Sequence, residues 1–122
     1  MNYNKKYVPD VLSEKDKKKQ IQSIRDKTER PKVDYKPRRS KYVVAFEKKY
    51  DTKINDMDFI NKNIIRKKGI DLILDKGRGA YYTSGSRPNQ TAESWALARL
   101  ASVIMNGAAR KIDIKIWNKY KR

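Results

Sequence analysis

The first clear helical pattern in the chain begins at Ser40. Apolar side chains follow at Tyr42, Val43, Phe46 and Tyr50, and this spacing puts them on one face of a helix. The hydroxyl of Ser40 is suited to accept a hydrogen bond from the first turn. We therefore expect a helix from this serine to about Tyr50, with its apolar face towards a core.

Two further helices, separated by a single glycine, are expected next. One begins near Asn55 or Asp56 and ends at Gly69, and a short one follows and ends at Gly77, because glycine readily takes the left-handed conformation that closes helices. Their apolar residues are Phe59, Ile60, Ile64, Ile65, Ile70, Leu72, Ile73 and Leu74. Two helices joined at such a corner resemble a helix-turn-helix, although any small helical domain needs corners of this kind.

The most regular apolar pattern lies between Thr91, a suitable cap, and the Asn106-Gly107 pair that stops it. Its larger apolar residues are Trp95, Leu97, Leu100, Val103, Ile104 and Met105. Alanines at 92, 96, 98 and 101 keep part of this helix thin, so another helix can approach it closely. We expect this to be the central helix of the protein.

The two ends of the chain carry weaker patterns. After Ser13, a plausible cap, only Ile21 and Ile24 are apolar up to residue 30, so a helix there is marginal by itself. Residues 29–39 contain two prolines and are expected to be extended, as an arm or a strap over the domain. Residues 112–122 fit either a strand or a short helix, and we favour a helix capped by Asp113.

These patterns predict a mainly α protein. A small helical domain should span residues 40–122, with the form of its C-terminal end left open between helix and strand. Residues 1–39 should form a basic, partly extended N-terminal arm that contains one marginal helix.

Composition points to a polyanionic partner. The 122 residues include 31 Lys and Arg against 14 Asp and Glu, a formal net charge of +17 at pH 7, and only 38% are apolar. Binding a polyanion relieves the self-repulsion of such a chain. Nucleic acid fits best, because the eight Tyr and two Trp can stack on bases. An anionic membrane surface is the competing target.

The chain contains neither Cys nor His. This excludes disulfides, Ser/His and Cys/His nucleophilic systems, and the usual thiolate and imidazole metal sites. The carboxylates form no credible acid/base pair, so we expect no enzyme activity, no cofactor and no metal. No stretch approaches the roughly 18 apolar residues of a membrane span and the first residues lead into no apolar run, so we expect neither secretion nor membrane insertion.

The most informative segment for binding is 77–91, whose composition is the least helix-like in the second half of the chain. Gly85 permits a turn with positive φ, and the residues around it stand just before the N-terminus of the central helix, which attracts anions. The residues expected to bind an anion or nucleic acid are Arg78, Tyr82, Ser84, Ser86, Arg87, Asn89 and Arg99, with Arg38 and Arg39 of the arm. In the alternative, the segment is only a tight corner and its arginines pair with Asp71, Asp75 or Glu93.

Residues 77–113 also resemble a known group of proteins. The string GRGAYYTSGSRPNQT over 77–91 is followed by Ser94-Trp95, by ALARLAS over 96–102, and by Gly107 and Asp113. This resembles an uncharacterised family of small basic proteins of large DNA viruses of algae and protists, with similar segments in tailed phages. The resemblance implies a viral origin and no particular activity.

Three functions are therefore open. The first is a non-enzymatic nucleic-acid-binding protein of a large DNA virus, with DNA favoured over RNA, which contacts mainly backbone phosphates and is packaged in the virion or present in the infected host cell. The second is a minor capsid or internal virion protein that contacts viral capsid or core proteins. The third is an interference factor that binds a host protein or a small anionic ligand.

Overall fold

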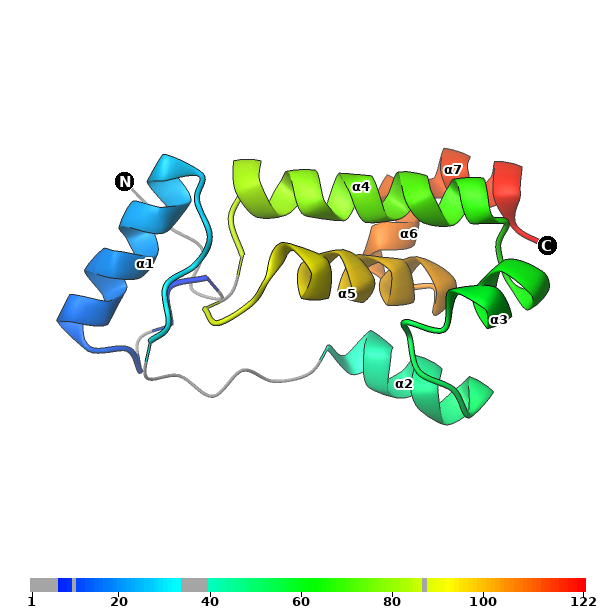
Figure 1. Ribbon diagram of the computed structural model, residues 1–122, viewed down its shortest axis with the longest axis horizontal. Helices are drawn as coiled ribbons and strands as arrows, with labels where there is room; N and C mark the ends of the chain where they lie inside the picture. Colours follow the sequence, from blue (N-terminus) through cyan, green and yellow to red (C-terminus); the bar gives the residue numbers. More distant parts are fainter. Residues whose placement is uncertain (1–6, 10, 34–39, 87) are drawn as a thin grey trace.

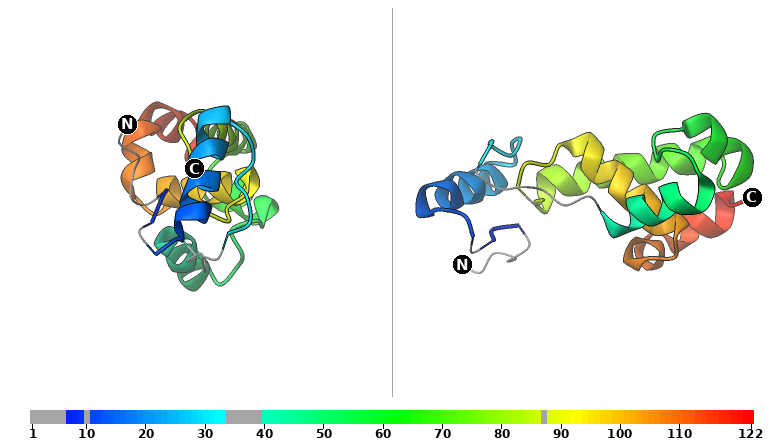
Figure 2. Two further views of the ribbon diagram at one scale, coloured as in Figure 1. Left: turned by 90° about the vertical axis from the view of Figure 1, so that its left-hand side faces the viewer. Right: turned by 90° about the horizontal axis from the view of Figure 1, so that it is seen from below.

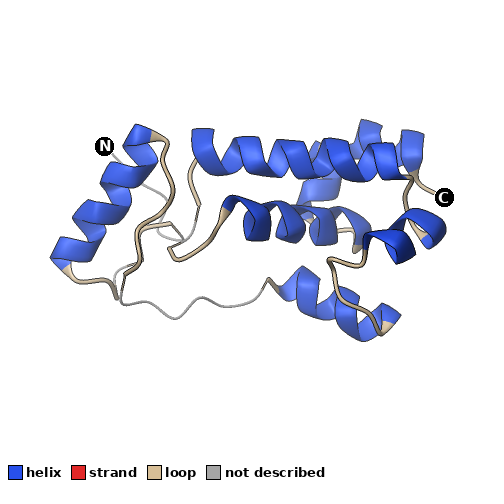
Figure 3. Ribbon diagram, viewed as in Figure 1, coloured by secondary structure: helices blue, strands red, loops and turns tan. Residues whose placement is uncertain are grey.

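The computed structural model describes residues 7–9, 11–33, 40–86 and 88–122. In these residues the regular structure is helical, as Figures 1 and 3 show, apart from one isolated bridge between Ile65 and Lys121. The helices are α1 (Glu14–Asp26), α2 (Lys41–Tyr50), α3 (Met57–Asn63), α4 (Lys67–Thr83), α5 (Ala92–Ile104), α6 (Ala108–Ile112) and α7 (Ile114–Tyr120). The predicted mainly α fold is confirmed.

The helices α4 and α5 lie side by side at the centre of the molecule and the other helices surround this pair (Figure 1). Helix α6 packs on α5 and α7 packs on α4, while α2 covers another side of α5. Helix α3 lies at the end of the pair where α4 begins, and α1 lies at the opposite end (Figures 1 and 2). The molecule is therefore elongated along α4.

The hydrophobic core fills the space between α2, α3, α4 and α5. Its fully buried members include Phe46, Ile60, Ile73 and Leu100, each at 0% exposure. No residue before Val43 belongs to this cluster in the part of the chain that the structure describes. Burial of apolar side chains in the 40–122 region thus supplies most of the driving force for folding.

The N-terminal caps predicted at Ser13, Ser40 and Thr91 are confirmed. The side chains of Ser13, Ser40 and Asp56 accept hydrogen bonds from the first turns of α1, α2 and α3. Thr91 and Ser94 form a reciprocal capping box at the start of α5. These local side-chain contacts satisfy backbone groups that each helix end would otherwise leave without partners.

The predicted helix ends at Gly69 and Gly77 are wrong, because both glycines lie inside α4, a single helix of 17 residues. A β-carbon on Gly77 would lie 2.6 Å from the Cα of Ala96, and one on Gly69 would lie 2.6 Å from the Cβ of Tyr120. The glycines therefore lie where α4 closely approaches α5 and α7. The approach of α4 to α5 agrees with the expectation that another helix packs closely on the alanine-rich face of α5. The corner between α3 and α4 lies at residues 64–66, so the helix-turn-helix interpretation placed its corner wrongly.

The remaining differences lie near the ends of the predicted loop and in the tail. Residues 77–83, which were expected to be irregular, form the last turns of α4. Packing of α4 against α5 stabilises the helix there in spite of its two glycines. The tail is helical, as favoured, and forms α6 and α7. The side chain of Asp113 makes no capping bond, however, because its carboxylate is used by Arg99. No helix within the described ranges has the length and apolar character to cross a bilayer.

Replacement of Gly77 by Ala should destabilise the protein by about 1–3 kcal/mol, because the new methyl group meets the backbone of α5. Gly79→Ala is the matched control on the same helix, since a β-carbon there has nothing within 4 Å. The control should gain about 0.5–1 kcal/mol from helix propensity. Urea unfolding of both variants measures the difference, and a stable Gly77→Ala protein would contradict the close approach of α4 and α5.

Candidate nucleic-acid interface

The structure describes six of the nine residues that the sequence grouped as one site. Arg38, Arg39 and Arg87 lie outside the described residues. The others fall on α4 (Arg78, Tyr82), on the loop that joins α4 to α5 (Ser84, Ser86, Asn89) and on α5 (Arg99). Their contacts decide how far each is available to an anion.

Arg78 forms exposed ion pairs with two carboxylates. Its Nε lies 3.0 Å from Oε2 of Glu93, and its Nη1 lies 2.8 Å from Oδ1 of Asp75. The hydrogen bond to Glu93 is the main cause that raises the pKa of Arg78 above its ordinary value. This arrangement, in which the arginine links the end of α4 to the start of α5, favours the structural alternative for Arg78. At an exposed site such pairs are weak, so a phosphate can still compete for the guanidinium.

Arg99 belongs to an interior ion pair. Its Nε and Nη2 each lie 2.8 Å from one carboxylate oxygen of Asp113, which is 1% exposed. This bidentate hydrogen bonding raises the pKa of Arg99 above its ordinary value. Nζ of Lys76 lies 3.8 Å from the same carboxylate. The pair fastens the joint between α6 and α7 to α5, so the contacts of Arg99 favour a structural role.

The loop between α4 and α5 is held by the N-terminal segment. The amide of Gln20 on α1 donates to the carbonyl of Ser86, 3.1 Å away. The side chain of Asn89 accepts from the backbone N–H of Val33 and donates to its carbonyl, both at 3.0 Å. Gly85 has φ +101°, the positive value that the sequence indicated. We call residues 28–33, which run along this loop, the strap (Figure 1).

The two adjacent tyrosines at the end of α4 have different surroundings, as expected for neighbours on a helix. Tyr81 is 1% exposed, and its hydroxyl accepts from the N–H of Arg30 and donates to the carbonyl of Gln90, each over 2.9 Å. Tyr82 is half-buried and packs edge-on against Tyr81, with the ring centres 4.9 Å apart. Ser84 is exposed. Tyr82 and Ser84 are therefore open to a ligand, in contrast to the buried Tyr81.

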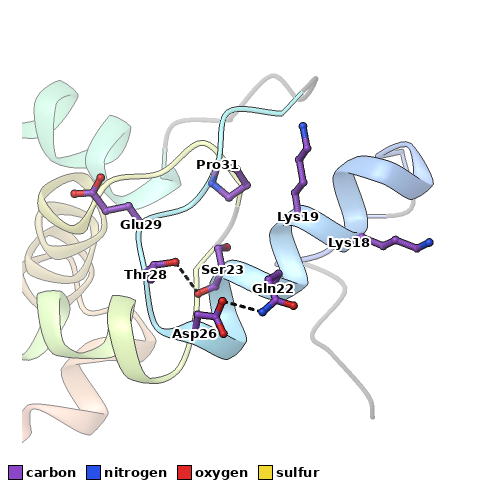
Figure 4. Close-up of a pocket in the computed structure, with 8 residues that line it drawn as sticks. All are labelled: Lys18, Lys19, Gln22, Ser23, Asp26, Thr28, Glu29 and Pro31. Carbon is purple, nitrogen blue, oxygen red and sulfur yellow. Dashed lines mark hydrogen bonds between the residues drawn. The ribbon is translucent and has the colours of Figure 1, made fainter.

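A groove of about 540 Å³ lies between α1 and the strap (Figure 4). Its lining includes the cations Lys18 and Lys19 and the acids Asp26 and Glu29. The carboxylate of Asp26 accepts a hydrogen bond from Gln22, as the dashed line in Figure 4 marks. Because cations and acids are balanced in this groove, it is a poor site for an anion.

A larger basic surface, which the sequence reasoning missed, forms where the end of α7 meets the corner between α3 and α4. The N–H of Arg66 donates to the carbonyl of Tyr120 over 2.9 Å, and the N–H of Arg122 donates to the carbonyl of Ile64 over 2.8 Å. Exposed cations from both segments thus become neighbours. We call this set the C-terminal basic surface: Lys62, Arg66, Lys67, Lys68, Lys115, Lys119, Lys121 and Arg122.

The C-terminal basic surface is not neutralised by the acids beside it. Asp58 and Asp71 lie one helical turn from its members, but within the described chain neither forms an ion pair with them. The single acid of residues 108–122, Asp113, is buried and paired with Arg99. The sequence signal for this surface is the cluster of six cations in residues 108–122. The cluster is left without a neighbouring acid at the surface only because Asp113 is buried in the fold. The described residues contain no group of acids suited to a metal ion.

Removal of residues 1–39 should leave a folded protein that melts cooperatively, because the main hydrophobic cluster lies between Val43 and Ile104. We expect the melting temperature to fall by several degrees, because the deletion uncovers Tyr81 and Trp95. In the intact protein Tyr81 contacts Arg30 and Trp95 contacts Tyr7. Circular dichroism during heating measures both properties. Loss of a cooperative transition would mean that the strap completes the core and that the domain boundary near Ser40 is misplaced.

Replacement of Arg99 by Met should destabilise the protein by about 3–5 kcal/mol, because Asp113 would remain buried without its bidentate partner. Arg78→Met is the matched control and should change stability by less than about 1 kcal/mol, since its ion pairs are exposed. Urea unfolding measures both. Equal small losses would show that the buried pair does not fix the α6–α7 joint.

Comparisons with known proteins place the chain in a family without assigning an activity. The model of a family of unknown function (DUF5824) matches residues 3–116. No curated protein and no solved structure matches the chain. The family match extends from the N-terminal segment through α6 and into α7, and it therefore covers nearly every element described above. The chain belongs to the DUF5824 family.

Proposed function

We propose that this protein binds nucleic acid, DNA in the first place, mainly through the phosphate backbone and without catalysis. The observation that carries the proposal is the C-terminal basic surface, whose eight exposed cations have no paired acid among the described residues. A group of cations without paired acids attracts the dense negative charge of a nucleic acid backbone and releases the counterions condensed on it. The net charge of +17 acts in the same direction.

The kinds of cation in this surface support contact with phosphates over reading of bases. Six of its members are Lys and two are Arg. Lysine acts as a mobile point charge, whereas arginine reads base edges through paired hydrogen bonds. Lys115 and Lys119 lie four residues apart on α7, so they share one helix face and can follow one strand of phosphates. The expected binding is therefore tight at low salt and weakly dependent on sequence.

The proposed setting is a large DNA virus, with the protein packaged in the virion or present in the infected cell. This part rests on the resemblance of residues 77–113 to small basic proteins of such viruses. A protein that contacts mainly phosphates suits a role in organising a genome, because that role needs affinity without sequence preference.

A contact with a viral capsid or core protein is the second candidate function. Ile112 and Ile114 are 68% and 40% exposed, and they flank Asp113 at the joint between α6 and α7. The exposed isoleucines suit an apolar contact with a partner, and the neighbouring Lys111 and Lys115 suit acidic residues around that contact. Such a contact should resist high salt, whereas binding to phosphates should not.

Duplex DNA of unrelated sequences should bind with similar affinity at about 50 mM salt. The slope of log K against log salt should lie at about −4 to −8, the value for about five to nine neutralised phosphates. Gel shifts or fluorescence anisotropy with duplex DNA, single strands and RNA at several salt concentrations measure this. Absence of binding to every nucleic acid at about 50 mM salt would overturn the proposed function.

The variant Lys67→Gln/Lys68→Gln should locate the interface. Loss of two phosphate contacts should flatten the salt slope by about 1.8, since each contact contributes about 0.9. The adjacent pair Lys48→Gln/Lys49→Gln on α2, outside the C-terminal basic surface, is the matched control and should flatten it much less. Equal effects of the two pairs would show that binding is spread over the whole protein and has no preferred surface.

A further inference from the structure

The guanidinium of Arg30 is buried with no carboxylate beside it in the described structure. The residue is 8% exposed, and its guanidinium lies 4.9 Å from the centre of the Tyr81 ring. Its Nη2 donates to the carbonyls of Ser23 and Thr28. Its Nε and Nη1 are buried and have no hydrogen-bond partner. A buried charge with unused donors costs free energy, and this burial lowers the pKa of Arg30 below its ordinary value.

Arg30 also lines a pocket of about 390 Å³ between the strap and the loop before α5. The described residues that line it are Arg30, Pro31, Lys32, Val33, Asn89, Gln90 and Thr91. Two of these described residues are cations and none of them is an acid, in contrast to the balanced groove in Figure 4. The pocket is large enough for an oxyanion group and several waters.

The walls of the pocket are fixed to each other. Asn89 on one wall makes two hydrogen bonds to the backbone of Val33 on the other. The Tyr81 hydroxyl joins the N–H of Arg30 to the carbonyl of Gln90. Thr91 is the N-terminal cap of α5, a helix of 13 residues, so the positive end of its dipole adds to the field of the two cations. A site held in this way needs little ordering when a ligand binds.

We propose that this pocket binds one phosphate-type oxyanion, with Arg30 as its principal cation and Lys32 as the second. In the proposed complex the guanidinium turns towards the pocket, and the ligand accepts a charge-assisted hydrogen bond from a donor of Arg30 that now has no partner. The oxyanion belongs either to a nucleic-acid phosphate or to a small phosphorylated molecule. The site lies at the α1 end of the molecule, remote from the C-terminal basic surface at the α3 end (Figure 1).

Inorganic phosphate is the probe for the first test. At ten times its dissociation constant it should raise the melting temperature by about 3–6 °C above a sodium chloride control of equal ionic strength. Arg30→Met should abolish this difference and should change the melting temperature without phosphate only slightly, because removal of an uncompensated buried charge offsets the loss of its contacts with Ser23, Thr28 and Tyr81. Lys48→Met, an equal change of charge on α2, should keep the full phosphate effect. Retention of that effect in Arg30→Met would overturn the proposal.

A titration of the intact protein keeps the proposal testable if Arg30→Met does not fold. Amide resonances of Arg30, Lys32 and Val33 and of residues 89–94 should shift with phosphate and saturate together, and shifts spread over all the lysine-rich helices would overturn the proposal. Competition by a short oligonucleotide at these resonances identifies the source as nucleic acid, and saturation by phosphate without such competition identifies a small molecule. Lys67→Gln/Lys68→Gln should keep the phosphate effect, so this site and the proposed DNA interface can fail independently.

Discussion

The rest of the structure depends on the close contact between α4 and α5. Gly77 and Ala96 let the two backbones approach so nearly that a methyl group on the glycine would meet the Cα of the alanine at 2.6 Å. The small side chains at the crossing allow the larger ones on either side, such as Ile73 and Leu100, to be buried completely. Every other helix of the 40–122 region then packs directly or indirectly against this pair.

This packing also decides which charges reach the surface. Asp113 is drawn inside by the bidentate bond to Arg99, so residues 108–122 expose only cations. At the other end, Arg30 is buried and has no acid beside it among the residues that the structure describes. The same folding event therefore creates an uncompensated basic surface and an uncompensated buried cation. Both leave the protein with free energy that an anionic ligand can recover.

The N-terminal segment has a different physical relation to the fold from that of the 40–122 region. It adds no member to the main hydrophobic cluster, although its own Leu12 is buried, and its contacts with the loop before α5 and the neighbouring helix ends include polar and aromatic ones at Tyr81, Trp95 and Asn89. Such contacts position a loop without driving the collapse of the chain. The loop before α5 is thus a structural joint and a candidate binding site at once, because the strap both holds it and forms the second wall of its pocket.

Local chemistry in the sequence determined the helices and their beginnings. Ser13, Ser40, Asp56 and Thr91 cap helices because a side-chain oxygen needs only the next three residues to do so. The mainly α class, the central α5 and the positive φ of Gly85 followed from equally local signals. None of these features depends on a partner distant in the chain.

Only the tertiary structure decided what the glycines and arginines do. Gly69 and Gly77 resemble helix ends until the neighbours that need the space are known, Tyr120 and Ala96. Arg99 resembled a ligand for anions until folding placed Asp113 beside it. The C-terminal basic surface likewise arises because backbone hydrogen bonds join segments that lie more than 50 residues apart. Sequence patterns report the conformation of a short segment, whereas these roles depend on which distant residue arrives next to each side chain, and packing of the whole chain determines that.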